Sequence, residues 1–141
     1  MGIDYGSVRI GISLSDESSS IAFGKEAIAN DKDSLKKITE LIKSNSVQKV
    51  VLGYPLNLKG AKTAQTLEVE DFEKKLRDFL NGNIGKDVIE IIRWDERFTS
   101  KMALSSMIES GMKKKKRQDK SNLDIISAAL LLQSYLDSIV K

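Results

Sequence analysis

Apolar and polar residues follow two patterns along this chain, and together these patterns predict a mixed α/β fold. Short apolar runs bounded by turn residues predict strands, whereas apolar residues three or four positions apart predict helices. The predicted strands span residues 1–4, 10–15, 21–29, 47–53 and 88–94. The predicted helices span residues 31–46, 63–80, 100–110 and 123–140. This order indicates a mixed five-stranded sheet with helices on both faces.

Three of these segments have clear inward faces or boundaries. In the first helix the apolar positions recur every three to four residues, and Asp31 or Asp33 can cap its start. In the second helix we expect Leu67, Phe72, Leu76, Phe79 and Leu80 to face inward, and residues 81–85 to form a turn. The run Val-Val-Leu at 50–52 is typical of a buried central strand.

Length and composition indicate one globular domain over residues 1–141. A chain of 141 residues with 40% hydrophobic and 30% charged residues is large enough for one sizeable core. No apolar stretch is long enough to predict a membrane-spanning helix, and the start lacks the pattern of a signal peptide. We therefore expect a cytoplasmic protein with no membrane partner, either a monomer or a weak dimer.

The chain has no cysteine and no histidine, which narrows the chemistry it can perform. Thiolate nucleophiles, zinc sites built from cysteine or histidine, and Ser-His-Asp catalysis are all excluded. A hydrolase built from this chain needs carboxylates, lysines, hydroxyls or a metal ion bound by carboxylates. Oxygen ligands favour hard cations such as Mg²⁺ or Mn²⁺.

Three unusual segments follow the predicted first, fourth and fifth strands. They are Asp4 with its glycine-containing turn, the loop at 53–60 with the only proline, and Asp95-Glu96-Arg97. Ligands of open α/β sheets usually bind at the carboxyl ends of strands. We expect all three segments to meet at one edge of the sheet. Asp4 at the mouth of a tight hairpin is also compatible with a simple turn role.

Four motifs in order and at the right spacing resemble the YqgF/RuvX-like family. They are Gly-Ile-Asp-Tyr-Gly-Ser-Val-Arg-Ile-Gly-Ile at 2–12 with Ser15-Asp16, Val-Leu-Gly-Tyr-Pro-Leu-Asn-Leu-Lys-Gly at 51–60, Trp-Asp-Glu-Arg-Phe-Thr at 94–99, and the helix at 124–136. The resemblance covers nearly the whole chain. It implies a fold similar to ribonuclease H and the Holliday junction resolvases. It also implies a link to 5′-end maturation of the 16S ribosomal RNA precursor.

The chain departs from the family pattern at two places. Relatives usually carry a few more residues before Gly2, so the native start can lie upstream of Met1. Relatives usually have a smaller or aliphatic residue at the position of Tyr54, which gives no reason to expect a change in chemistry.

Carboxylates are the expected catalytic groups, because a metal ion that they hold can activate water and stabilise both reacting oxygens. We expect Asp4, Glu96 and Asp124 to be catalytic and to bind Mg or Mn. Neighbouring residues at a strand end point to opposite faces, so we favour Glu96 and keep Asp95 as the alternate ligand. Taken alone, Asp95-Glu96-Arg97 is also typical of a surface ion-pair cluster, and Asp124 of a helix N-terminal residue.

Basic and polar residues near this edge are candidates for binding nucleic acid. The expected nucleic acid is precursor rRNA, either free or bound to the ribosome, or else DNA. Those singled out are Arg9, Asn57, Arg97 and the cationic run Lys113, Lys114, Lys115, Lys116 and Arg117. The arginines are also typical salt-bridge partners, and the run is also typical of a solvated loop. Gly60 can contact the sugar-phosphate backbone, and Tyr5 and Trp94 can stack on bases. Burial of Trp94 in the core is expected at least as strongly as stacking.

Three other functions remain open at this point. Asp-x-Gly hairpins also bind ATP phosphates in the actin, heat-shock ATPase and sugar-kinase group, but those proteins have two lobes and this chain has one. A non-catalytic RNA- or ribosome-binding module needs the basic run and not the carboxylates. Among nucleases, the sequence does not separate junction DNA from single-stranded RNA.

Overall fold

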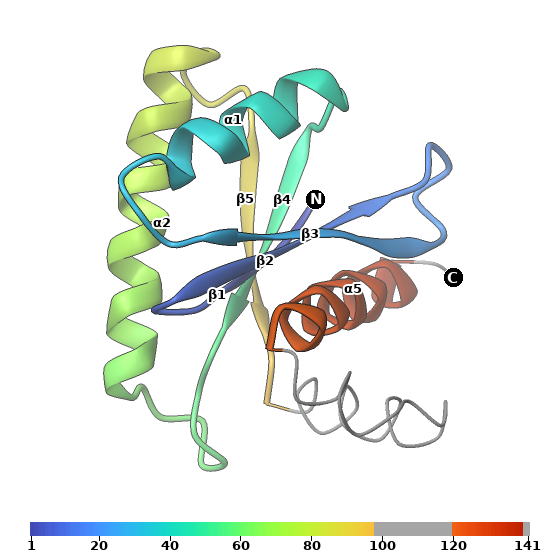
Figure 1. Cartoon of the computed structure of the whole chain (residues 1–141). Helices are drawn as coiled ribbons and strands as arrows, with labels where there is room; N and C mark the ends of the chain where they lie inside the picture. The colour runs from blue at the N-terminus through green and yellow to red at the C-terminus, as the bar shows by residue number, and fades with distance from the viewer. Residues whose placement is uncertain (98–119, 140–141) are drawn as a thin grey trace.

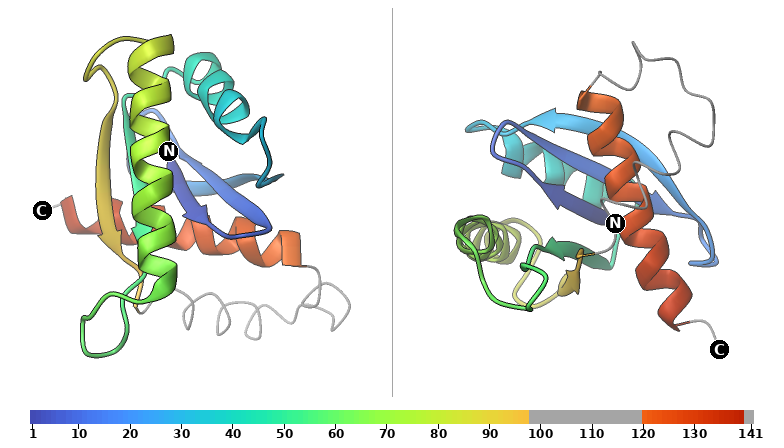
Figure 2. Two further views of the ribbon diagram at one scale, coloured as in Figure 1. Left: turned by 90° about the vertical axis from the view of Figure 1, so that its left-hand side faces the viewer. Right: turned by 90° about the horizontal axis from the view of Figure 1, so that it is seen from below.

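The computed structural model describes residues 1–97 and 120–139, which form a five-stranded sheet between two layers of helices (Figures 1 and 2). The strands are β1 (Gly2–Tyr5), β2 (Arg9–Ser15), β3 (Ala22–Ala29), β4 (Lys49–Tyr54) and β5 (Glu90–Asp95). The helices are α1 (Ser34–Ser44), α2 (Ala64–Asn83) and α5 (Lys120–Ile139). The predicted α/β class and element order are confirmed for these residues, and the predicted helix at 100–110 lies outside them.

The sheet is mixed, with strand order β3-β2-β1-β4-β5. Strands β1, β2 and β3 form an antiparallel meander, whereas β4 runs parallel to β1 and β5 runs parallel to β4. The carboxyl ends of β1, β4 and β5 therefore meet at one edge of the sheet, as the sequence predicts. The buried run Val50-Val51-Leu52 lies in β4, which is flanked by strands on both sides.

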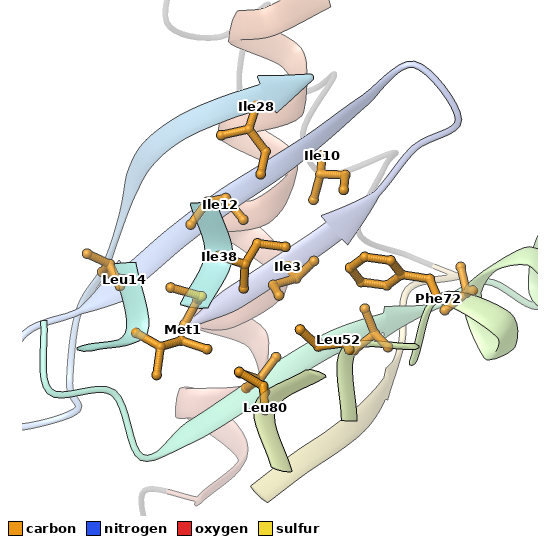
Figure 3. Close-up of a cluster of buried hydrophobic side chains, with 14 residues drawn as sticks. Met1, Ile3, Ile10, Ile12, Leu14, Ile28, Ile38, Leu52, Phe72 and Leu80 are labelled. Atoms are coloured by element: carbon orange, nitrogen blue, oxygen red, sulfur yellow. The ribbon is translucent and has the colours of Figure 1, made fainter. Parts of the chain in front are cut away.

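One face of the sheet forms the main core with α1 and α2. Isoleucines of β1, β2 and β3 pack there against Ile38 of α1 and Phe72, Leu76 and Leu80 of α2 (Figure 3). These side chains alternate along each strand, which is why every second residue of β2 is a large apolar one. Helix α5 covers the other face, where its buried stripe Ala128, Leu131, Leu132 and Leu136 contacts the sheet.

Helix α2 and strands β3, β4 and β5 differ in detail from the sequence prediction. Helix α2 continues through the predicted turn to Asn83, because Ile84 and Gly85 close the helix on the carbonyl of Leu80 and Gly82 is tolerated in the last turn. Leu67, expected inside, is 59% exposed. It is nine residues from the buried Leu76, and at about 100° per residue this places the two on opposite sides of the helix. Strands β3, β4 and β5 begin one or two residues later than predicted.

Helix α1 is shorter than predicted at both ends. Asp33 is its N-cap residue, but its side chain makes no capping hydrogen bond. Asp31 instead accepts a hydrogen bond from the Asp33 backbone N–H at 2.9 Å and shapes the turn before the helix.

No helix within residues 1–97 and 120–139 is long and apolar enough to cross a membrane.

Candidate active site

Asp4 and Glu96 come together at the edge where β1, β4 and β5 end. Asp4 lies in β1 opposite Gly11 of β2, on the face that α5 covers. Glu96 directly follows β5, and its backbone N–H donates to the Tyr54 carbonyl at the end of β4, 3.4 Å away. The neighbouring Tyr5 points to the opposite face and packs against Phe72, with ring centroids 4.7 Å apart.

Two glycines make room for these groups between the sheet and α5. A side chain at Gly11 would overlap the backbone carbonyl of Asp124, and one at Gly53 would overlap the carboxyl group of Glu96. The missing side chains therefore let Asp124 and Glu96 approach the sheet beside Asp4. Sequence reasoning did not identify these two positions. Glycine inside an apolar strand is a known signal of such a close approach, and both glycines carried it.

The carboxyl groups of Asp4 and Glu96 share a hydrogen bond, in which protonated Glu96 is the donor. Burial, and then the charge of Asp4, raise the pKa of Glu96 to about 8. Burial, and then the charge of Asp124, raise the pKa of Asp4 to about 6, although the hydrogen bond from Glu96 acts in the opposite direction. Near neutral pH the pair therefore holds about one proton, which a cation can replace.

Asp124 lies close enough for its charge to act on Asp4, but its carboxylate is held by an arginine. Arg9, the first residue of β2, pairs through Nε with Oδ2 of Asp124 at 2.9 Å. Helix α5 begins at Lys120, so Asp124 lies inside the helix and is not its N-terminal residue. Within residues 1–97 and 120–139, no three acidic side chains surround a common point closely enough to form a preformed metal site.

Asp95 and Arg97 form a local pair beside this site. The Asp95 carboxylate accepts hydrogen bonds from the Arg97 backbone N–H at 2.9 Å and from its Nε at 2.6 Å. Burial opposes the effect, but the bonds from Arg97 hold the pKa of Asp95 below its ordinary value. The geometry agrees with the expectation that Glu96 reaches the site while Asp95 bonds locally.

The proline loop after β4 is held together by its own hydrogen bonds. The side chain of Asn57 accepts bonds from the backbone N–H groups of Lys59 and Ala61, both at 2.9 Å. Gly60 has a φ of +80°, and the nearest atom to its missing side chain is a guanidinium nitrogen of Arg97. Asn57 thus shapes the loop in this structure, and the loop lies against Arg97.

Trp94, a candidate for stacking on bases, instead faces helix α5. Trp94 is partly buried, packs edge-on against Tyr135 and donates to the hydroxyl of Ser134 at 3.1 Å, so its ring faces α5. The predicted nucleic-acid contacts Lys113, Lys114, Lys115, Lys116 and Arg117 lie outside the described residues.

Two solved structures, each of a protein in complex with a Holliday junction, share the fold of this chain. The chain aligns with the fowlpox virus resolvase in complex with Holliday junction DNA over 99% of its own length and 97% of that chain, with a TM-score of 0.58 and 15% identity. It aligns with the RuvC protein of T. thermophilus, in complex with a Holliday junction substrate, over 98% and 94%, with a TM-score of 0.57 and 13% identity. The fold is therefore the ribonuclease H-like fold of these resolvases.

The family follows from a closer comparison. The model of the RuvX family, described as Holliday junction resolvase, matches residues 1–138, and the chain belongs to this family. A protein of Ruminiclostridium cellulolyticum named "Putative pre-16S rRNA nuclease" is 43% identical, over 99% of this chain and 94% of that protein. A protein of Flavobacterium psychrophilum with the same name is 41% identical, over 96% and 94%. The resemblance inferred from the four motifs is thereby confirmed.

Proposed function

We propose that this protein is a metal-dependent nuclease whose reaction centre is the group Asp4, Glu96 and Asp124. The observation that carries the proposal is the contact between the Asp4 and Glu96 carboxyl groups, which lie beside a third carboxylate with no cation of their own among the described residues. Repulsion between such groups is unfavourable unless a proton or a metal ion relieves it. Hydrolysis of a phosphodiester bond is the chemistry that a site of this kind supports.

The residues fit a hard divalent cation. All of the candidate ligands are carboxylate oxygens, which Mg²⁺ and Mn²⁺ prefer. A bound divalent ion would supply an activated water molecule and stabilise the charge that develops on the phosphate. The chain itself would contribute the three carboxylates, and a bound cation would displace the proton that Asp4 and Glu96 share. Asp95, already bonded to Arg97, is the alternate ligand.

The proposed substrate is the precursor of 16S ribosomal RNA, cut during maturation of its 5′ end. The support is the name carried by relatives that are 35–43% identical over nearly the whole chain. Such a role implies a cytoplasmic protein that meets the precursor free or on the ribosome. The alternative is a Holliday junction resolvase, which the family description and the fold of the solved resolvases favour.

A cleavage assay with both substrates separates these functions. Purified protein is incubated with Mn²⁺, Mg²⁺ or EDTA, and with a precursor RNA spanning the 5′ end or a synthetic four-way DNA junction. We expect cleavage of the RNA that depends on the metal ion and is lost in Asp4→Asn. Cleavage of the junction alone would support the resolvase. RNA binding without cleavage of either substrate would instead support the non-catalytic module.

We also propose that nucleic acid reaches the site along Arg97, the loop of Asn57 and the cationic run at 113–117. Contacts to phosphates are strong at low salt and largely independent of sequence. Replacing Lys113, Lys114 and Lys115 by Ala should reduce the slope of log affinity against log salt by roughly 0.7 for each lost contact. The rate at saturating RNA should change little. An unchanged slope would mean that RNA enters from another side.

A further inference from the structure

The ion pair between Arg9 and Asp124 joins two segments that are 115 residues apart, and the proposed chemistry leaves it unexplained. Both side chains are 29% exposed, so the pair lies at the surface of the site and not in the core. The ion pair uses Nε of Arg9 and one oxygen of Asp124 at 2.9 Å, and within residues 1–97 and 120–139 it is the one hydrogen bond or ion pair of that guanidinium. The two terminal nitrogens of Arg9 are thus not engaged by the described residues.

The Arg9 guanidinium places a positive charge beside a group of carboxylates that repel one another. Asp124 is near enough for its charge to act on Asp4, which in turn touches Glu96. The guanidinium of Arg9 neutralises the outermost of these three carboxylates. For the same reason it competes with a divalent cation for Asp124. The structure thus shows the carboxylates of Asp4 and Glu96 together and the third one bound to Arg9.

We propose that Arg9 gates metal binding: it holds Asp124 in the free protein and releases it when a phosphate of the nucleic acid draws the guanidinium away. The proposal rests on the proposed nuclease function and adds a coupling between substrate and metal. Guanidinium groups bind phosphate oxygens through paired N–H donors. Because Arg9 is partly exposed, Asp124 does not block a phosphodiester from reaching its guanidinium. Arg9 adjoins Val8, which is 65% exposed at the tip of the β1–β2 hairpin, so an approaching strand can reach it.

Thermodynamic linkage turns the gate into a measurable coupling. If nucleic acid frees Asp124, then it must increase the affinity for the cation, and the cation must increase the affinity for nucleic acid by the same factor. A fixed structural role for Arg9 makes the opposite prediction. In that case Arg9 would orient Asp124 toward the cation, and its loss would weaken metal binding.

The test measures Mn²⁺ affinity from the electron paramagnetic resonance signal of unbound Mn²⁺, with and without a short phosphorothioate RNA that resists cleavage. Binding of Mn²⁺ to the RNA alone is subtracted. We compare the wild type with Arg9→Gln and with the matched control Arg77→Gln, which removes an arginine paired at 3.0 Å with Glu73 on helix α2. In the wild type, RNA should tighten Mn²⁺ binding about fivefold or more.

In Arg9→Gln, Mn²⁺ should bind the free protein more tightly than it binds the wild type, and RNA should add little further affinity. Arg77→Gln should behave as the wild type. Weaker Mn²⁺ binding by folded Arg9→Gln, or an undiminished effect of RNA, would overturn the gate. Wild-type protein that binds no Mn²⁺ under either condition would instead contradict the proposed function itself.

A second measurement follows the wild type, so that its result does not depend on the fold of a variant. The Nε–H signal of Arg9 in ¹⁵N NMR, assigned with Arg9→Lys, should exchange slowly with solvent in the free protein because Asp124 accepts its hydrogen bond. Adding the RNA should shift this signal and alter its exchange. A signal that is unaffected by saturating RNA would show that Arg9 stays on Asp124, and the gate would be wrong.

Discussion

Two groups of acidic side chains lie on opposite faces of the same sheet, and they differ in their partners. The acidic edge consists of Asp4, Glu96 and Asp124 on the α5 face. The α2 cluster consists of Glu70 and Glu73 on helix α2 with three cations, which are Lys62, Arg77 and Arg93. Each face therefore carries carboxylates near the end of β4 or β5. Among the described residues, both carboxylates of the α2 cluster pair with cations, whereas at the acidic edge only Asp124 does, with Arg9.

The partners determine how each carboxylate titrates. In the α2 cluster, the hydrogen bond from Lys62, followed by that from the Tyr54 hydroxyl, lowers the pKa of Glu70. At the acidic edge, burial and neighbouring negative charge raise the pKa of Asp4 and Glu96 instead. Carboxylates satisfied by cations are typical of structural ion pairs, whereas carboxylates forced together without them are typical of functional sites. The contrast therefore supports the proposal that the acidic edge carries the chemistry, and it predicts a stabilising role for the α2 cluster.

The sharpest test of this contrast is Asp4→Asn. The change keeps the shape of the side chain and removes one negative charge, so cleavage should fall below detection. The free energy of unfolding at pH 8 in EDTA should rise by about 1–3 kcal/mol, since one pKa unit corresponds to about 1.4 kcal/mol. Activity is measured with Mn²⁺ and stability by urea unfolding. Full activity in this variant would remove Asp4 from the reaction.

The matching change in the α2 cluster, Glu73→Gln, should have the reverse pattern. Glu73 is 7% exposed and accepts from Arg93 at 2.7 Å and from Arg77 at 3.0 Å. Loss of its charge weakens both bonds at a buried position, so the free energy of unfolding should fall by about 1–3 kcal/mol. Cleavage per folded molecule should be retained. A loss of cleavage at unchanged stability would show that the two clusters are not separate in function.

The pH dependence of stability should reveal the acidic edge directly. The folded pKa values of Asp4 and Glu96, about 6 and about 8, lie above the ordinary pKa values of these side chains, 3.8 and 4.5. The folded state therefore keeps protons that the unfolded chain has already released. Their contribution to stability is complete below about pH 4 and is lost as the pH rises through about 6 and then about 8.

This profile is measured by urea unfolding in EDTA from pH 5 to 8.5, and again with Mg²⁺. The difference between wild type and Asp4→Asn isolates the acidic edge from other groups, such as the Met1 amine, whose pKa burial lowers to about 6. Saturating Mg²⁺ should remove most of the loss above pH 7, because the cation replaces the proton. A wild-type profile parallel to that of Asp4→Asn would contradict the raised pKa values.

The sequence predicted most of the fold and part of the site, for identifiable reasons. Alternating apolar residues in β1 and β2 and the uninterrupted run in β4 have strong local signals, so strand positions and the shared edge were found. Glu96 was preferred over Asp95 because neighbouring residues at a strand end diverge. Leu67 was predicted to face inward because the sequence does not fix which side of the helix is buried. A leucine close to the apolar positions was therefore assigned to the buried side.

The parts that were missed depend on contacts between distant segments. Arg9 was a candidate for binding phosphate, with a salt bridge as the alternative. In this structure it pairs with Asp124 from the other end of the chain, a partner that the sequence did not indicate. Likewise the sequence did not indicate the partners of Tyr54, whose hydroxyl donates to Glu70 at 3.0 Å and whose ring lies 4.8 Å from the Arg93 guanidinium. These contacts leave untouched the expectation that Tyr54 does not change the chemistry. Local periodicity contains no information about such pairings, because they arise only when helices pack on the sheet.

The smallest expected effect comes from Lys62→Met, at the rim of the α2 cluster. Lys62 pairs with Glu70 at 2.9 Å, but the lysine side chain is 56% exposed, so water and salt screen the interaction. Glu70 also keeps the hydrogen bond from Tyr54 and the charge of Arg93 when Lys62 is removed. The urea midpoint should therefore shift far less than in Glu73→Gln, and the shift should vanish at high salt. A loss as large as that of Glu73→Gln, persisting in high salt, would mean that Lys62 fixes the proline loop against α2 and that the loop, not the ion pair, holds this face together.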